Sequence, residues 1–343
     1  MLDDLKYIHE KDAGDALGIA ERQAGQLLHD FKLQAKQFGN VDSVVYAGMG
    51  GSGLAGQLLA SWPPLGVPFE LVRNYDIPDY VGSNTLFIAS SYSGNTEETL
   101  SALAQAEAKG AQIAVIASGG KLKQIAEEKG YLFALIPKAE QPRYAALYNL
   151  KALLDILHMA GVVKEDTRPE LERASKHLQS AVQSWRAEVP TRNNPAKQFA
   201  QELLGKSVVI YAGPKLFPAA YKWKISVNEN AKQVAWVGQL PEFNHNEFIG
   251  WSQQPVDKPY AVVDLRSRLE HPRIQKRFEV SERLLSGMRP APLVAQAQGD
   301  TLPEQLLWTV AYGDFVTLYL GILNGLNPAP IDLVEKFKAA LNA

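Results

Sequence analysis

The stretch SVVYAGMGGSG, residues 43–53, decides the fold. A short run of strand-forming residues, Ser43–Ala47, enters a glycine-rich turn, and 53–60 then carries the apolar content of a helix. Buried strands that pass through a glycine turn into a helix are the repeating unit of α/β proteins, whose strands pair in parallel. This stretch therefore predicts a parallel sheet with helices on both faces.

The same alternation continues along the chain. Further strands are expected at 69–73, 85–89, 112–117, 131–136, 207–212 and 260–264, and helices at 14–38, 96–109, 122–129, 217–232, 303–324 and 331–341. The tripeptide YAG follows an apolar strand twice, at 46–48 and at 211–213. We expect two related α/β domains, residues 1–155 and 196–343, joined by a charged helical connection over 156–195.

Composition limits the classes of function. The 343 residues are 46% hydrophobic and carry a formal charge of −2. A chain without excess positive charge is not expected to bind nucleic acid or an anionic membrane. The chain has no cysteine, which excludes disulfides and thiolate catalysis, and its N-terminus lacks an apolar signal segment, so we expect a cytoplasmic protein. The apolar stretch 310–326 is interrupted by Asp314 and Asn324 and predicts a buried helix. The six histidines have no metal-binding spacing, and no metal is expected.

Gly48–Gly53 has the spacing G-x-G-x-x-G between a strand and a helix. This spacing fits a dinucleotide site, in which the helix N-terminus binds a pyrophosphate, but it also fits a tight turn that binds nothing. A dinucleotide site needs an acidic residue about 20 positions further on. Neither candidate for this acidic residue is well placed: Glu70 lies at the start of the next strand, and Asp76 lies past its end.

The next loop, SSYSGNTEE at 90–98, is richer in hydroxyl groups. Ser91, Ser93 and Thr96 can donate hydrogen bonds to phosphate oxygens, while the following helix offers its N-terminal amides. Asn95 with Glu98 also fits an ordinary capping box. We predict a phosphate site at the strand ends, formed by Ser52, Ser91, Ser93 and Thr96 with Gly50 and Gly51 close by.

These two loops resemble the sugar isomerase (SIS) domain. The chain also carries the segments QPR (141–143), NENAK (228–232) and LPEFNHNE (240–247), with Lys338 near its end, and in this combination it resembles the bifunctional phosphoglucose/phosphomannose isomerases. The resemblance implies two SIS domains, each a parallel sheet flanked by helices. It also implies a homodimer with an active site assembled between domains and subunits, and isomerisation of a hexose 6-phosphate through a cis-enediol with neither metal nor redox cofactor.

The resemblance also implies a role for four residues. Glu229 would be the base that moves the proton, and His245 would open the sugar ring, reaching the partner subunit's site. Arg143 would stabilise the enediolate, and Lys338 would serve the ring or carbonyl oxygen, with Lys336 as the alternative register. From residue type alone, Glu229 also fits a solvated helix carboxylate, His245 a structural histidine, and both Arg143 and Lys338 surface charges. The aromatic residues around His245 (Phe243, Phe248 and Trp251) predict an exposed interface rim.

One feature departs from the family. A threonine or serine often precedes the terminal lysine and is associated with the mannose epimer, whereas 328–337 contains neither, with Ala329 as the counterpart. Glucose 6-phosphate is therefore the first expected aldose and mannose 6-phosphate the second. Two alternatives remain: a non-catalytic sugar-phosphate sensor and a nicotinamide-dependent oxidoreductase.

Overall fold

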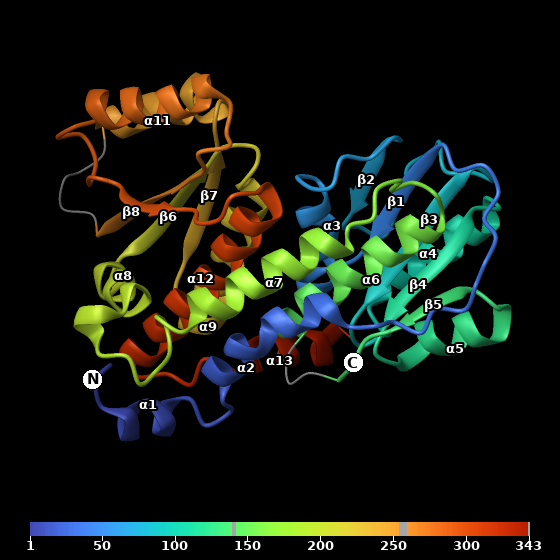
Figure 1. Cartoon of the computed structure of the whole chain (residues 1–343), viewed down its shortest axis with the longest axis horizontal. Coiled ribbons are helices and arrows are strands. Elements are labelled where there is room, and N and C mark those ends of the chain that lie inside the picture. Colours follow the sequence, from blue (N-terminus) through green and yellow to red (C-terminus); the bar gives the residue numbers. More distant parts are fainter. Residues whose placement is uncertain (139–141, 254–258, 342–343) are drawn as a thin grey trace. The chain divides into compact units, whose positions relative to one another are not determined.

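The computed structural model describes residues 1–138, 142–253 and 259–341 (Figure 1). The chain divides into two compact units. The first, called here the N-terminal unit, is Arg22–Lys176, and the second, the C-terminal unit, combines Met1–Glu21 with His177–Ala343. The division falls inside helix α7 (Arg168–Val182).

The N-terminal unit contains a five-stranded parallel sheet of order β2-β1-β3-β4-β5. Its strands are β1 (Ser43–Ala47), β2 (Phe69–Val72), β3 (Thr85–Ser91), β4 (Gln112–Ala117) and β5 (Leu132–Leu135). Its main helices are α3 (Gly50–Leu59), α4 (Glu97–Ala108), α5 (Gly120–Lys129) and α6 (Ala146–Met159). The predicted parallel α/β architecture is confirmed.

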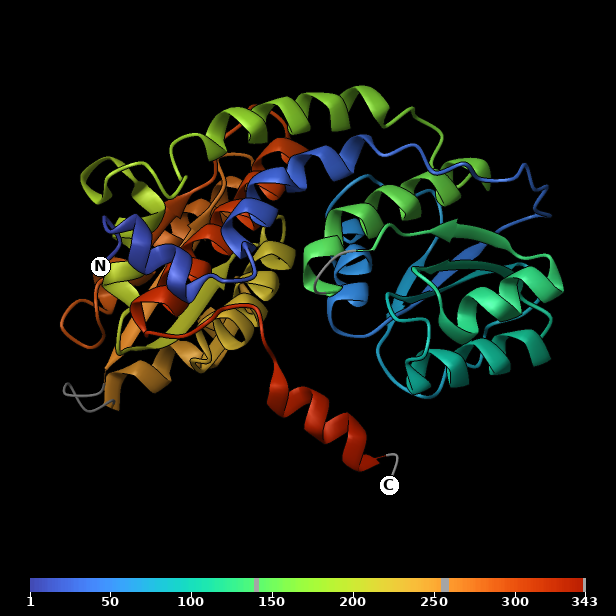
Figure 2. The same ribbon diagram turned by 90° about the horizontal axis from the view of Figure 1, so that it is seen from below.

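Every residue of β1 and β3 is buried, because helices cover both faces of this sheet. Helices α4 and α5 pack on one face and α3 and α6 on the other (Figure 2). The strands read as continuous apolar runs for this reason, as is usual for buried parallel sheets.

The C-terminal unit contains a second parallel sheet, of order β7-β6-β8-β9. Its strands are β6 (Ser207–Ala212), β7 (Ala235–Gln239), β8 (Tyr260–Arg266) and β9 (Leu293–Gln296). Its helices are α1 (Leu5–Lys11), α8 (Pro195–Leu203), α9 (Phe217–Ala231), α10 (Glu247–Gly250), α11 (Pro272–Leu284), α12 (Leu302–Leu323) and α13 (Asp332–Leu341), while α2 (Ala16–Arg22) ends at the border of the two units.

Helix α12 is long and apolar enough to cross a membrane, but 94% of its most apolar window is buried inside the protein. It packs against α8 and α9 as the core helix of the C-terminal unit. The buried helix predicted for this stretch is confirmed.

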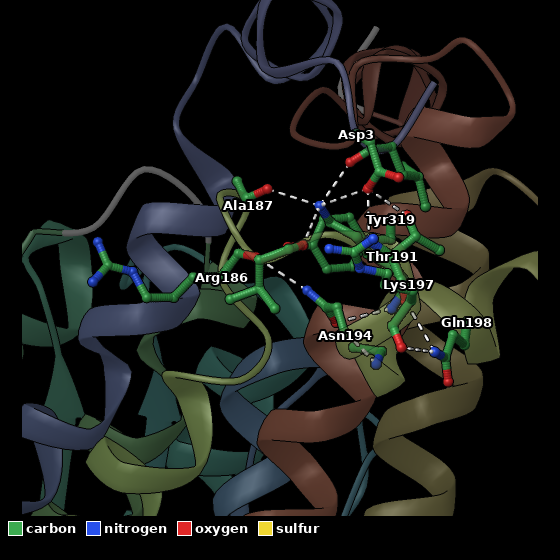
Figure 3. A network of polar contacts seen from close by, with 12 residues as sticks. Asp3, Arg186, Ala187, Thr191, Asn194, Lys197, Gln198 and Tyr319 are labelled. Atoms are coloured by element: carbon green, nitrogen blue, oxygen red, sulfur yellow. Dashed lines mark hydrogen bonds and ion pairs between the residues drawn. The ribbon is translucent and has the colours of Figure 1, made fainter.

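A buried lysine ties the first residues of the chain to the C-terminal unit (Figure 3). Lys197 is fully buried, and its ammonium donates to the carbonyl oxygens of Leu2, Ala187 and Val189 at 2.6, 2.7 and 2.9 Å. Asp3 accepts from both the backbone and the hydroxyl of Thr191 nearby. These bonds explain why Met1–Glu21 belongs with the second half of the sequence.

The single helix expected at 14–38 is wrong. Helix α2 ends at Arg22, a 3-10 helix follows at Gln23–Leu28, and 29–42 has no helix. The Gln26 amide explains the change, because it donates to Tyr144 O and accepts from the Tyr148 N–H. Tertiary hydrogen bonds to the start of α6 thus outweigh the local helical pattern.

Candidate active site

The two loops predicted to bind phosphate lie next to each other in the N-terminal unit. They follow β1 and β3, which are paired neighbours and end at the same edge of the sheet. Ser52 joins the loops, because its Oγ accepts a hydrogen bond from the Tyr92 N–H at 2.8 Å. The carboxyl ends of adjacent parallel strands are where open α/β sheets bind ligands.

The hydroxyl groups of the second loop converge. Ser91 Oγ lies 2.7 Å from Thr96 Oγ1 and 3.4 Å from Ser93 Oγ, and it accepts from the Gly94 N–H at 3.1 Å. Thr96 is the N-cap residue of α4, yet its side chain makes no cap hydrogen bond. The structure therefore gathers Ser91, Ser93 and Thr96 at a helix N-terminus, with Ser52 hydrogen-bonded to the backbone of the same loop.

A third loop, 118–121, fixes this arrangement. Ser118 Oγ donates to Tyr92 O at 2.6 Å, and Asn95 Oδ1 accepts from the Lys121 N–H at 3.0 Å. Gly94 has φ of +70°, and a Cβ there would lie 1.8 Å from Gly119 O, so only glycine fits. The alternative of a capping box formed by Asn95 and Glu98 is not supported, because Thr96 is the N-cap residue of α4 and the Asn95 side chain accepts from the Lys121 N–H.

The glycines at 48–53 serve close packing of the backbone. A Cβ on Gly48 would lie 3.0 Å from Ser90 O, and one on Gly53 would lie 2.6 Å from Gly48 O, while Gly50 has φ of +49°. The G-x-G-x-x-G spacing is thus explained without a nucleotide. Glu70, one residue considered for a ribose, accepts a hydrogen bond from Tyr80 Oη at 2.8 Å.

Arg143 is buried, with 2% of its surface exposed, so the alternative of a surface charge is wrong. Its guanidinium lies 4.7 Å from the centre of the Tyr144 ring. The short 3-10 helix that carries it, Pro142–Ala145, packs against α3, which begins in the glycine loop. Gln141 of the same motif lies outside the described residues.

Glu229 lies in the last turn of α9 and is half-buried. It is twelve residues past Phe217, the first residue of α9, which corresponds to about 18 Å along the helix axis. Buried contacts fasten α9 to α12, including the ion pair between Lys222 and Asp314 and a 2.9 Å hydrogen bond from Asn230 Nδ2 to Thr317 Oγ1. Glu229 is therefore carried on a rigid support.

His245 is exposed, in a 3-10 helix (Glu242–His245) after β7, and its ring makes no hydrogen bond to the described residues. The alternative of a histidine held by its neighbours is therefore not supported by any contact in that part of the chain. The neighbouring Phe243 packs in a core cluster with Val209 and Tyr211 of β6. Glu229, at the C-terminal end of α9, and His245, in the 3-10 helix that follows β7, thus lie on separate elements of the C-terminal unit.

The exposed aromatic rim expected around His245 is wrong in part. Phe243 and Trp251 are buried in the core cluster, against which Phe248 packs. The large exposed apolar side chains of this region are instead Trp236 and Ile249. The sequence shows aromatic residues beside a polar segment, but it does not show whether their side chains are buried in the core or exposed at a rim.

Lys338 lies on α13, which has no buried residue, and its ammonium lies 2.8 Å from Glu335 Oε1. Lys336 is exposed on the same helix. This contact of Lys338 is made within its own helix, and the choice between the two lysines stays a prediction. Across the described ranges, no group of three or more His, Cys, Asp or Glu side chains is placed to hold a metal.

A carboxylate that the sequence did not single out fills the β6–α9 turn of the C-terminal unit. Glu270 Oε1 accepts from the Lys215 N–H at 2.7 Å, and a Cβ on Gly213 would lie 2.5 Å from the same oxygen. Burial raises the pKa of Glu270, and its hydrogen bonds to backbone amides partly oppose this. The turn that corresponds in sequence to the glycine loop of the first unit therefore already holds an anionic group.

Comparisons with known proteins show the family and support the fold. The model of the SIS domain matches residues 37–162, and that of the "bacterial phospho-glucose isomerase C-terminal SIS domain" matches 192–341. A "bifunctional phosphoglucose/phosphomannose isomerase" of Caldicellulosiruptor bescii is 35% identical over 88% of this chain and 90% of its own length.

A relative with another activity is also similar. The "D-glucosamine-6-phosphate 4-epimerase" of Sulfolobus acidocaldarius is 36% identical over 65% of this chain and 68% of its own. Among solved structures, a "glucose-6-phosphate isomerase like protein" from Thermus thermophilus superposes with a TM-score of 0.67 at 18% identity, covering 98% of both chains, which supports the fold.

Proposed function

We propose, from the premise that the chain belongs to the bifunctional phosphoglucose/phosphomannose isomerase family, that it interconverts glucose 6-phosphate and fructose 6-phosphate. Mannose 6-phosphate is the second aldose in this proposal. The reaction moves a proton between C1 and C2 through a cis-enediol and has no net redox change, so it requires no nicotinamide. The proposal includes no metal.

The hydroxyl cluster between β3 and α4 carries this proposal. A phosphate dianion there would accept from Ser91, Ser93 and Thr96 and from the first amides of α4, where the helix dipole favours negative charge. Gly50, Gly51 and Ser52 of the adjoining loop would line its other side. The Glu270 carboxylate in the corresponding turn of the C-terminal unit supports a single phosphate site per chain.

The proton transfer is assigned to Glu229, with substrate oxygens served by Arg143 and Lys338. A carboxylate on a fixed helix can remove the C2 proton and return it to C1, which is general base and then general acid catalysis. The buried guanidinium of Arg143 would stabilise negative charge on the enediolate, because a cation acts strongly where water is excluded.

We propose a homodimer with shared sites, and the exposure of His245 supports it. An exposed imidazole without a hydrogen-bond partner in the described residues is available to another chain. A closed two-fold dimer would let each His245 complete the partner's site, with the imidazole exchanging protons near neutral pH. The domain roles proposed are phosphate binding by 1–155 and catalysis by 196–343, joined by 156–195, in a cytoplasmic enzyme.

A coupled assay on fructose 6-phosphate, with glucose and mannose phosphates resolved, tests the proposal. Aldose formation that persists in the presence of a chelator and without nicotinamide is the expected result. Glucosamine 6-phosphate should be assayed in parallel, because one relative is named as its 4-epimerase. Binding of hexose phosphate without turnover would instead identify a sensor. Epimerisation of glucosamine 6-phosphate without isomerisation of fructose 6-phosphate would identify a 4-epimerase.

A further inference from the structure

Lys232 is the residue of the NENAK segment to which neither the fold nor the proposed reaction gives a role. It is the C-cap residue of α9, three positions after Glu229, and its backbone adopts the left-handed conformation with φ of +52°. Among the described residues, only Asp15 is another non-glycine with positive φ. Helices usually place glycine or asparagine at this point, because a Cβ there is strained. Lys232 thus has a left-handed backbone conformation that is unfavourable for a residue with a Cβ.

The side chain of Lys232 explains this choice. Its ammonium donates to Glu229 O at 2.8 Å, Pro328 O at 2.9 Å and Asn327 O at 3.1 Å, which uses all three of its hydrogens. The carbonyl oxygens of Glu229 and Pro328 therefore lie within about 6 Å of each other, since both accept from one nitrogen. Lys232 thus joins the end of α9 to the connection that leads from α12 to α13.

Other contacts also hold this connection, in which Pro328 is buried. Asn324, which precedes it, donates to Ala231 O at 3.1 Å, but that bond secures the end of α12. Within the connection, the Ala329 N–H donates to Asn327 Oδ1, which is a local turn contact. Helix α13 itself has no buried residue. The three carbonyl contacts of Lys232 add to these and join the segment before α13 directly to the backbone of Glu229.

We propose that Lys232 is a positioning residue. It holds the Asn327–Pro328 connection against α9, the helix that carries Glu229, and so fixes the position of Lys338 on α13 relative to Glu229. The proposal rests on the proposed function, since Glu229 and Lys338 are the groups it would align. Its mechanical part, the attachment of the connection to α9, can be measured without turnover.

Lys197 offers a matched control, because its ammonium also donates to three carbonyl oxygens but touches none of the proposed site residues. Lys232→Met, Lys232→Gly and Lys197→Met should be compared by kcat, KM and thermal midpoint. We expect Lys232→Met to lower kcat by about 10- to 100-fold, the scale of a small misplacement of reacting groups. Its KM should change by less than about threefold, and its thermal midpoint little. Lys197→Met should lower the thermal midpoint and leave kcat per folded enzyme near wild type.

Lys232→Gly separates the ammonium from the strained backbone. The glycine variant relieves the left-handed strain but lacks the three hydrogen bonds, so it should be as slow as Lys232→Met. Recovery of wild-type kcat by the glycine variant, or normal kcat in Lys232→Met, would overturn the proposal.

Hydrogen exchange provides the readout that does not depend on activity. Amides of 327–341 should exchange faster in Lys232→Met than in wild type and in Lys197→Met. If wild type turns over no hexose phosphate, the proposed function fails, whereas faster exchange would still support the attachment. Unchanged exchange with an active wild type would overturn the positioning role alone.

Discussion

At the scale of single residues, the hydroxyl groups of Ser91 and Thr96 are held toward each other rather than toward the helix that follows. Thr96 occupies the N-cap position of α4 but contacts Ser91 Oγ instead of the helix amides. Serine and threonine are favoured at N-caps because they satisfy those amides, so a site that leaves this role unfilled is suited to an external anion.

Thr96→Val removes a proposed phosphate donor and keeps the shape of the side chain. Hydrogen bonds to charged groups contribute about 1.5–3 kcal/mol, so KM for fructose 6-phosphate should rise by about 10- to 100-fold with a smaller change in kcat. Steady-state kinetics measures this. Ser101→Ala on the same helix is the control, because that hydroxyl donates to Tyr75 O outside the cluster. Equal KM values for all three proteins would remove Thr96 from the phosphate site.

Glu229→Gln keeps the size of the side chain and removes its ability to accept a proton. Turnover should fall by about 10²- to 10⁴-fold while binding of the sugar phosphate, measured by calorimetry, changes little. Glu202→Gln, at an exposed position on α8, is a control for the loss of one carboxylate. If Glu229→Gln turns over at the wild-type rate, Glu229 is an ordinary helix carboxylate.

Some of these residues could be predicted from the sequence and others could not. The difference depends on how far apart in sequence the residues of each site lie. The hydroxyl loop was visible because its residues are contiguous, and they do converge. Glu229 and His245 could be singled out only by resemblance, since each alone looks like a surface residue. Glu270 was missed because its partners, the amides at Lys215 and the turn at Gly213, are more than fifty residues away.

At the scale of elements, prediction succeeded where both faces of a strand are buried. The bounds predicted for β1, β4 and β6 are those observed, because continuous apolar runs between turns are a local signal. Strands β7 and β9 were missed, since they form the two edges of their sheet and expose Trp236 and Val294. The helix at 14–38 failed because contacts with α6 outweighed its periodicity.

The Glu270 turn predicts a pH dependence of stability. Because burial raises its pKa in the native protein above the usual value of 4.5, the unfolded chain releases this proton first as pH rises. This group therefore contributes stability below pH 4.5 that is lost as pH rises through its native pKa. Urea unfolding of wild type and Glu270→Gln from pH 4 to 7 should show the wild type losing stability relative to the variant.

A control of opposite sign lies on α11. Lys276 holds the pKa of the exposed Glu279 below its usual value through a hydrogen bond, so this group contributes stability above pH 4.5 that is lost as pH falls. Glu279→Gln should therefore show a small effect in the opposite direction, reduced by solvent screening. If the free energies of unfolding of wild type and Glu270→Gln differ by the same amount from pH 4 to 7, the Glu270 carboxyl has the same pKa in the folded and unfolded protein.

At the scale of the whole molecule, each chain has one set of proposed phosphate-binding hydroxyls in the N-terminal unit and one proposed base in the C-terminal unit. The corresponding turn of the C-terminal unit is filled by Glu270. The proposed boundaries at 155 and 196 stay a prediction. What joins two such chains is not a property that local sequence patterns encode, which is why the dimer came from resemblance alone.

Complementation between two inactive variants tests the shared site. His245→Ala and Glu229→Gln chains should each be nearly inactive as homodimers, because every site lacks one group. In a mixed dimer with exchanged histidines, one site combines Glu229 of the first chain with the second chain's intact His245, while the other site carries both defects. Co-expression with two affinity tags, followed by purification through both, should recover up to half of the wild-type kcat per dimer. Verified mixed dimers without activity would place His245 in its own chain's site or outside the chemistry.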